Sequence, residues 1–116
     1  MIVDDEDDMR ALMRSMIELA NGGLSVAGEA SDGEAAVRQW RELRPEVVLL
    51  DQRMPGLTGL ETAERILQES PDQPVILFTS YLDPEVKRFA DELGVRACVN
   101  KVDARKVVLR LRECAA

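Results

Sequence analysis

The sequence predicts an α/β fold made of five strand–helix units around one doubly wound parallel sheet. Short apolar runs alternate with longer segments whose apolar residues recur at helical spacing, and the alternation continues along the whole chain. Two of the runs, 47–50 and 75–78, are apolar throughout, as expected for strands covered on both faces. The 116 residues are enough for one domain that buries a sizeable core.

The first half of the chain predicts two strands and two helices before the central strand. Residues 1–3 form a short strand, and residues 7–20 a helix that Asn21-Gly22-Gly23 ends. We expect its inner face to carry Met9, Leu12, Met13, Met16 and Leu19. Residues 24–30 predict a second strand, and 31–33 a turn. The helix over 34–43 ends before Pro45, and its inner face carries Ala36, Val37 and Trp40.

The second half repeats the pattern three times. Strand 47–50 precedes a helix over 57–69, where Thr58 and Glu61 have the spacing of a capping box. A turn at 70–74 leads to strand 75–78, and Asp83-Pro84 begins a helix that Gly94 closes. We expect that helix to bury Val86, Phe89, Ala90 and Leu93. After strand 95–99, Asp103 caps a last helix whose inner face carries Ala104, Val107, Val108 and Leu111.

Five such units predict a flavodoxin-like (βα)5 sheet with the strand order 2-1-3-4-5. In a sheet of this kind the topological switch lies between strands 1 and 3, and ligands bind outside the carboxyl ends of the strands there. Those two strands run into Asp4-Asp5 and Asp51. The topology therefore predicts a ligand site formed by these acids.

Composition excludes several classes of function. The net charge of −7 argues against direct nucleic-acid binding, which needs clustered Lys and Arg. No apolar run approaches the about 20 residues of a membrane span, and the early acidic residues do not fit a signal peptide, so we expect a cytoplasmic protein. Cys98 and Cys114 lack the spacing of a metal or redox site. The absence of histidine excludes Ser-His-Asp and Cys-His catalysis and histidine-bound zinc.

The predicted rim has the residues needed to form an aspartyl phosphate. Strand 75–78 runs into Thr79, and strand 95–99 leads to Lys101, so both join the acids. Like charges at close range repel, and a site made of oxygen ligands suits Mg²⁺. A carboxylate such as Asp51 can attack a phosphoryl group while the metal, Lys101 and the Thr79 hydroxyl take up charge on the phosphoryl oxygens.

Four motifs together resemble the receiver domain of two-component response regulators. They are Val3-Asp4-Asp5-Glu6, residues 48–59 around Asp51, Leu77-Phe78-Thr79-Ser80 and Val99-Asn100-Lys101. The resemblance spans the chain and implies one receiver domain over residues 1–116, with any output domain outside it. It implies that a sensor histidine kinase phosphorylates Asp51, and that the fourth helix, fifth strand and fifth helix form the surface that switches.

The resemblance also assigns roles within the site. Asp5 would bind Mg²⁺ directly with support from Asp4, and Asp51 and the backbone carbonyl of Arg53 would complete the protein ligands. Thr79 would be the switch hydroxyl and Lys101 the partner of the phosphoryl group. Such a domain catalyses at most its own phosphorylation and dephosphorylation, so we do not expect an enzyme.

Three features depart from the family pattern. Val102 follows the lysine where proline is frequent, and Cys98 stands where an aromatic switch residue is frequent. The small Cys98 leaves space that we expect Tyr81 to fill. Arg53 and Tyr81 flank the acceptor, and we expect these bulky side chains to slow the attack of water on a phosphoryl group.

Other interpretations stay open at this point. One is a phosphorylation-independent interaction or dimerisation module. Another is a phosphorylation-dependent homodimer in which basic residues of the last helix pair with acids of a partner's fourth helix. The basic residues are Arg105, Lys106, Arg110 and Arg112, and the acids are Asp83, Glu85, Asp91 and Glu92. A third is a Mg²⁺-dependent phosphohydrolase, which would need a second catalytic acid at the position of Arg53. A flavin-binding protein of similar topology is disfavoured, because the acidic rim would repel the flavin phosphate in the absence of a metal. Residues 28–33 resemble receivers joined to DNA-binding domains, which suggests transcription regulation as the output.

Overall fold

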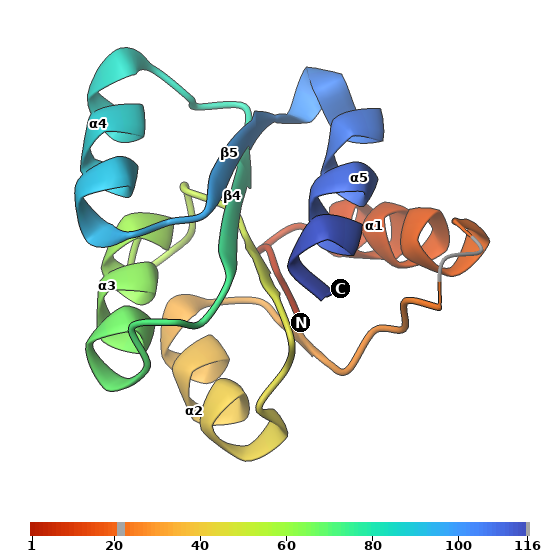
Figure 1. Ribbon diagram of the computed structural model, residues 1–116, viewed down its shortest axis with the longest axis horizontal. Coiled ribbons are helices and arrows are strands. Elements are labelled where there is room, and N and C mark those ends of the chain that lie inside the picture. Colours follow the sequence, from red (N-terminus) through yellow and green to blue (C-terminus); the bar gives the residue numbers. More distant parts are fainter. Residues whose placement is uncertain (21–22, 116) are drawn as a thin grey trace.

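The computed structural model describes residues 1–20 and 23–115 and shows one parallel sheet between two layers of helices (Figure 1). The sheet has the predicted order β2-β1-β3-β4-β5. Its strands are β1 (Ile2–Val3), β2 (Glu29–Ala30), β3 (Val48–Leu50), β4 (Val75–Thr79) and β5 (Ala97–Asn100). The helices are α1 (Asp7–Leu19), α2 (Gly33–Leu43), α3 (Gly59–Glu69), α4 (Pro84–Leu93), the 3-10 turn η1 (Lys101–Asp103) and α5 (Ala104–Ala115).

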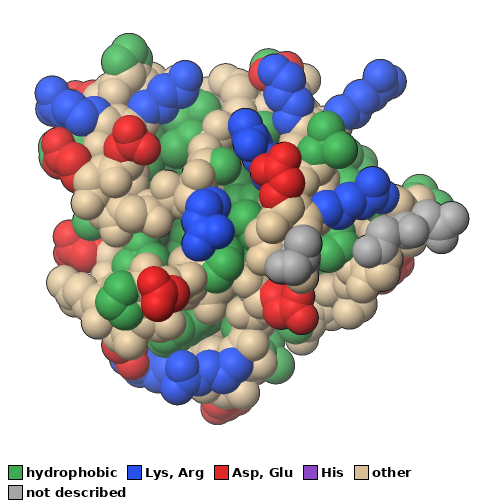
Figure 2. Space-filling view, in the orientation of Figure 1, with side chains coloured by type: hydrophobic (Ala, Val, Ile, Leu, Met, Phe, Trp, Pro, Cys, Tyr) green, Lys and Arg blue, Asp and Glu red, His purple; other side chains and the backbone are tan. Residues whose placement is uncertain are grey.

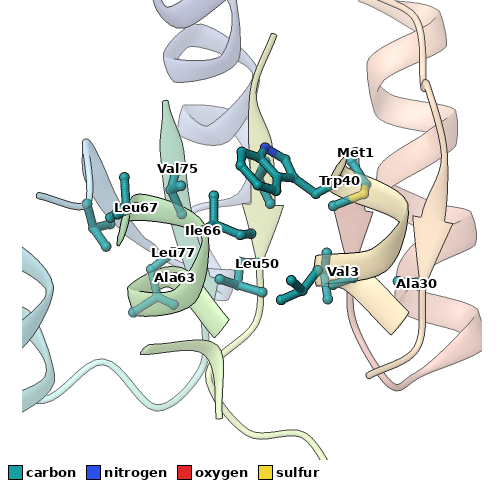
Figure 3. Packing of buried hydrophobic residues seen from close by; sticks show 14 of the residues in the cluster. Met1, Val3, Ala30, Trp40, Leu50, Ala63, Ile66, Leu67, Val75 and Leu77 are labelled. Carbon is teal, nitrogen blue, oxygen red and sulfur yellow. The ribbon is translucent and has the colours of Figure 1, made fainter. Parts of the chain in front are cut away.

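The two faces of the sheet carry separate hydrophobic cores, because successive strand residues point to opposite sides. In β3, Val48 and Leu50 belong to the core under α2, α3 and α4, whereas Leu49 belongs to the core under α1 and α5. Figure 3 shows the first of these cores, in which Trp40 packs above the strands. The Trp40 indole N–H donates to the Gln73 side chain at 2.9 Å, which satisfies its polar atom at the edge of the core.

The helix caps predicted at Asp83 and Thr58 are confirmed, and Asp32, which the sequence placed in a turn, caps α2. Asp32 and Asp83 accept hydrogen bonds from the backbone N–H groups of Ala35 and Val86, both at 2.8 Å. Thr58 and Glu61 form a reciprocal capping box at the start of α3. That helix begins at Gly59, two residues later than predicted, since Thr58 is its extended cap.

Several expected inward residues lie on the outside. Leu12 and Leu19 of α1 are 49% and 83% exposed, and the buried stripe consists of Met13 and Ile17. Phe89 of α4 is 43% exposed, while Ala90 takes the inner position. The helical repeat identified one face in each case, but the sheet covers a narrower stripe than the apolar residues span.

Two other predicted boundaries were wrong. The predicted strand over 24–30 is reduced to Glu29–Ala30, because β1 has only two residues and offers no partner to residues 24–27. Asp103 does not cap the last helix: it belongs to η1, which the Asn100 side chain caps by accepting from the Val102 N–H at 3.1 Å. Of the predicted helix stop, Asn21 and Gly22 lie outside the described residues, and Gly23 has a positive φ of 77°.

The surface carries both signs of charge. On the face shown in Figure 2, acidic and basic side chains are interspersed, with apolar side chains visible between them. Two of the charged pairs join α2 to α3, Arg41 with Glu69 at 2.9 Å and Arg65 with Glu34 at 3.3 Å. Within the described ranges, no helix is long and apolar enough to cross a membrane.

Candidate functional site

The carboxyl ends of four strands bring the predicted residues to one rim of the sheet. Asp4 follows β1 and Asp51 follows β3, and the register that pairs Val3 with Leu50 places the two acids side by side. Thr79 is the last residue of β4 and is fully buried. Lys101 follows β5, which pairs with β4 up to Thr79 and Asn100. The topology therefore assembles residues that are up to 97 positions apart.

Lys101 lies between two buried carboxylates. Its Nζ donates to Asp4 Oδ2 at 2.8 Å and to Asp51 Oδ2 at 3.0 Å. Asp4 and Asp51 are only 3% and 5% exposed. Burial raises the pKa of Asp4, and its hydrogen bonds from Lys101 and the Glu6 backbone offset this only in part. Burial also acts to lower the pKa of Lys101, but the hydrogen bonds to the two acids outweigh it and hold the pKa above its usual value.

Backbone groups hold the other oxygen of each acid. Asp4 Oδ1 accepts from the Glu6 N–H at 2.9 Å, and Asp51 Oδ1 accepts from the Gln52 N–H at 2.7 Å. Both carboxylates are therefore fixed on two sides, by a backbone donor and by the lysine. This leaves Asp51 oriented at the rim with a cation already placed beside one of its oxygens.

Gln52 and Gly59 support the loop after Asp51, and the sequence reasoning assigned them no role. The Gln52 side chain accepts from the Leu60 N–H at 2.9 Å, and its carbonyl accepts from the Gly59 N–H at 2.9 Å. A Cβ on Gly59 would overlap the carbonyl oxygen of Asp51. The start of α3 thus rests directly on the backbone of Asp51, and a glycine just after a helix-capping threonine was the available signal.

The acids also form a group suited to a cation. Carboxylate oxygens of Asp4, Asp5 and Glu6 lie within 4.8 Å of one another, and Asp5 and Glu6 are exposed. Oxygen ligands with room for water on the open side fit Mg²⁺. Asp51 is not in this group within the part of the chain that the structure describes, although Lys101 joins its carboxylate to that of Asp4. Glu6, predicted as a solvated residue at the helix start, contributes instead.

Arg53 and Tyr81, which follow Asp51 and Thr79 by two residues each, form a stacked pair. The Arg53 guanidinium lies 3.9 Å from the centroid of the Tyr81 ring, and both side chains are exposed. The Tyr81 backbone N–H donates to Thr79 Oγ1 at 3.1 Å, so the loop that carries the ring is tied to the threonine. The two residues predicted to flank the acceptor therefore contact each other.

Tyr81 does not fill the space beside Cys98, contrary to the prediction. A cavity of about 260 Å³ lies there, lined by Leu82, Lys87, Cys98, Val99, Asn100, Asp103, Lys106 and Arg110. The Tyr81 ring stacks on Arg53 because that contact offsets the cost of leaving an aromatic face in water. Burial raises the pKa of the Cys98 thiol, which keeps it protonated at neutral pH. With Val102 after it, Lys101 still reaches both acids.

Comparisons with known proteins agree with this geometry. The family model described as the response regulator receiver domain matches residues 1–112. The chain belongs to this family. It is 40% identical over 79 residues to the response regulator GacA of Pseudomonas viridiflava, covering 68% of this chain and 36% of GacA. It is 32% identical over 115 residues to the transcriptional regulatory protein YdfI of Bacillus subtilis, covering 99% of this chain and 53% of YdfI.

Solved structures show the same architecture. A DNA-binding response regulator of the LuxR family from Staphylococcus aureus superposes with a TM-score of 0.90 at 28% identity, covering 99% of this chain and 96% of that one. The strand order and receiver fold predicted from the sequence are therefore confirmed. The receiver spans about a third to a half of the curated relatives GacA and YdfI.

Proposed function

We propose that Asp51 accepts a phosphoryl group and holds it as an acyl phosphate. The observation that carries the proposal is the Lys101 ammonium between Asp4 and Asp51, at 2.8 and 3.0 Å. Of the residues at the rim, Asp51 is the buried acid that ends the central strand, and its second oxygen is fixed by the Gln52 N–H. A preorganised nucleophile beside a cation suits attack on phosphorus.

The donor is a phosphohistidine of a sensor histidine kinase. An Asp51 carboxylate oxygen forms a bond to phosphorus as the phosphorus–nitrogen bond breaks, and the leaving imidazole takes up a proton. Lys101 can then pair with a phosphoryl oxygen and the Thr79 hydroxyl with another. Among the ligands we propose for Mg²⁺ are Asp5, Asp4, Asp51 and the Arg53 carbonyl. The metal supplies charge neutralisation for the transferring group.

The response would pass to the surface formed by α4, β5 and α5. Thr79 is tied to the Tyr81 N–H, and this loop leads directly into α4. Drawing the hydroxyl toward a phosphoryl group would break that contact and shift the population of the loop and helix. The names of YdfI and of the Staphylococcus aureus regulator support transcription as the output of the longer protein.

A phosphorylation-dependent homodimer through this surface is part of the proposal. Basic residues of α5 would meet acids of α4 in a second copy, although Arg110 and Lys106 already pair within the chain with Glu113 at 3.1 Å and Asp103 at 4.0 Å. Reversing the charge of Arg110 should abolish any phosphorylation-induced increase in mass measured by light scattering. Unchanged self-association of that variant would contradict the dimer.

Intact mass after incubation with acetyl phosphate and Mg²⁺ tests the central step. We expect the protein to gain one phosphoryl group, and D51N to gain none. D72N, a change at an exposed acid in the turn before β4, is the matched control and should be phosphorylated normally. Equal uptake by D51N would overturn the assignment. A Mg²⁺ titration that left the amide NMR shifts of residues 4–6 untouched would contradict the metal site.

A further inference from the structure

A groove between α3 and α4 lies outside the phosphoacceptor rim. The two helices run side by side on one face of the sheet (Figure 1). The groove offers about 360 Å³ and is lined by Leu60, Glu61 and Glu64 of α3 and by Phe89, Glu92 and Leu93 of α4. A space of this size accommodates a large side chain from another molecule.

The floor of the groove is apolar and includes an exposed aromatic ring. Phe89 is 43% exposed, whereas Leu93 and Leu60 are half-buried against the core. Residues 85, 89 and 92 share one flank of α4 because they are spaced four and three apart. An exposed phenylalanine inside a hollow, next to two leucines, differs from a single apolar residue on a flat surface and is typical of a contact site.

The walls of the groove carry one sign of charge. All three charged residues that line it are glutamates, Glu61, Glu64 and Glu92. Glu61 is engaged in the capping box, where its carboxylate accepts from the Thr58 N–H at 2.9 Å. Within the described residues, Glu64 and Glu92 have no ion-pair partner at 4.0 Å or less. Arg88 is not among the lining residues, and its guanidinium lies 5.4 Å from the Phe89 ring centroid.

We propose that this groove docks a basic amphipathic helix of a partner protein. The helix would insert one large aliphatic side chain over Phe89 and place Lys or Arg residues one turn before and after it, facing the glutamates. Helices bind in grooves of this kind through an apolar anchor, and complementary charge at the rim fixes the register and speeds association. The acidic walls would repel nucleic acid and anionic lipid surfaces.

The probe is a 15-residue alanine-rich helical peptide with a central leucine and a lysine one turn to each side. We expect its titration to shift the amide NMR signals of Leu60, Phe89 and Leu93. A control peptide with glutamates in place of the lysines should bind at least tenfold more weakly. Equal affinity for the two peptides, or shifts confined to other helices, would overturn the proposal.

Charge-reversal variants distinguish binding in this groove from a general effect of net charge. E64K/E92K should weaken binding of the lysine peptide at least tenfold. E42K/E46K makes the same change of net charge at exposed positions outside the groove and should bind within twofold of the unmodified protein. F89A should lose binding and F89L should keep most of it, with both retaining the fold by circular dichroism. If the receiver instead occupies its own groove, self-association sensitive to E64K/E92K will appear without peptide, which would contradict a separate partner.

Discussion

A single lysine controls the balance of charge at the rim. Two carboxylates that are almost fully buried cannot both remain ionised beside each other without a cation. Lys101 supplies it from the end of a strand that is not adjacent to either acid in the sheet. The same contact that stabilises the fold would therefore also place a cation for the proposed phosphoryl transfer to Asp51.

Removing that lysine should cost stability that a metal can restore. K101A leaves Asp4 and Asp51 buried and unpaired, so we expect the free energy of unfolding at pH 7 to fall by about 3–5 kcal/mol. Urea denaturation followed by the fluorescence of Trp40, the one tryptophan, measures this. Millimolar Mg²⁺ should raise the stability of K101A more than that of the unmodified protein, because the metal replaces the missing charge.

K106A provides the comparison for this variant. Lys106 has a side chain that is 71% exposed and a 4.0 Å contact with Asp103, so its removal should change stability by less than about 0.5 kcal/mol. Similar losses in K106A and K101A would contradict the role given to the buried lysine.

The stacked Arg53–Tyr81 pair should prolong the life of the acyl phosphate. The Arg53 guanidinium lies 3.9 Å from the centroid of the Tyr81 ring, and the two residues follow Asp51 and Thr79 by two positions each, so we expect the pair to obstruct water. We expect R53A and Y81A each to shorten the half-life several-fold, and the double variant to be no faster than the faster single variant, because each residue holds the other. Phosphate release from the purified phosphoprotein measures the rate.

R88A is the control for loss of a stacked arginine, since Arg88 lies beside Phe89 and not beside the acceptor. A half-life of seconds in the unmodified protein would show that the pair gives no protection.

Among the secondary-structure elements, the contact between α3 and the end of β3 positions Asp51. The backbone N–H groups of Gly59 and Leu60 in the first turn of α3 donate to the carbonyl and side chain of Gln52, the residue after Asp51, both at 2.9 Å. Because the helix start is also fixed by the Thr58–Glu61 capping box, a change in this turn should be felt at the site.

G59A should be far more damaging than a glycine change three residues earlier. A methyl group on Gly59 would overlap the Asp51 carbonyl, so we expect a loss of about 3 kcal/mol or more and slower phosphorylation. Gly56 has a φ of 78° and nothing within 4 Å of its added Cβ, so G56A should cost about 1 kcal/mol, from backbone strain alone. Equal unfolding midpoints for the two variants would contradict the close packing inferred for Gly59.

At the scale of the whole molecule, a free amino group on Met1 gives the stability of the 116-residue chain a distinct dependence on pH. The Met1 amino group donates to the Val47 carbonyl at 2.9 Å, and burial lowers its pKa from 8.0 to about 6. Folding makes this amine harder to protonate, so protonation favours the unfolded chain. The folded chain therefore has its full stability above pH 8 and loses part of it as the pH falls through 6. With no histidine in the chain, no side chain of ordinary pKa titrates in this window.

We therefore expect the 116-residue chain to lose about 2–3 kcal/mol of unfolding free energy between pH 8.5 and pH 5.5, from the size of the pKa shift. Acetylation of the amino terminus removes the titrating group, so the acetylated chain should show a flat profile over the same range. Parallel profiles for the two forms would contradict the buried amine.

Much of this architecture could be predicted because local pattern and topology agreed. Runs that are apolar on both faces identified the central strands, and caps such as Thr58 and Asp83 marked helix starts. Parallel strands then force their carboxyl ends to one rim, so Asp51 and Lys101 could be placed together before any coordinates were known. The patterns could not show that Leu12, Leu19 and Phe89 lie outside, since periodicity identifies a face but not how much of it a neighbouring element covers.

The order of residues along the chain was sufficient for the fold class, the strand order and the chemistry available at the rim, because these depend on periodicity and on where strands end. Side-chain partners depend on distances between segments that are far apart in sequence. Only the folded chain could show that Lys101 joins both acids, that Glu6 enters the acidic group while Asp51 does not, and that Arg53 holds Tyr81 away from Cys98. Each of these side chains could contact more than one neighbour, and only the three-dimensional packing determines which contact forms.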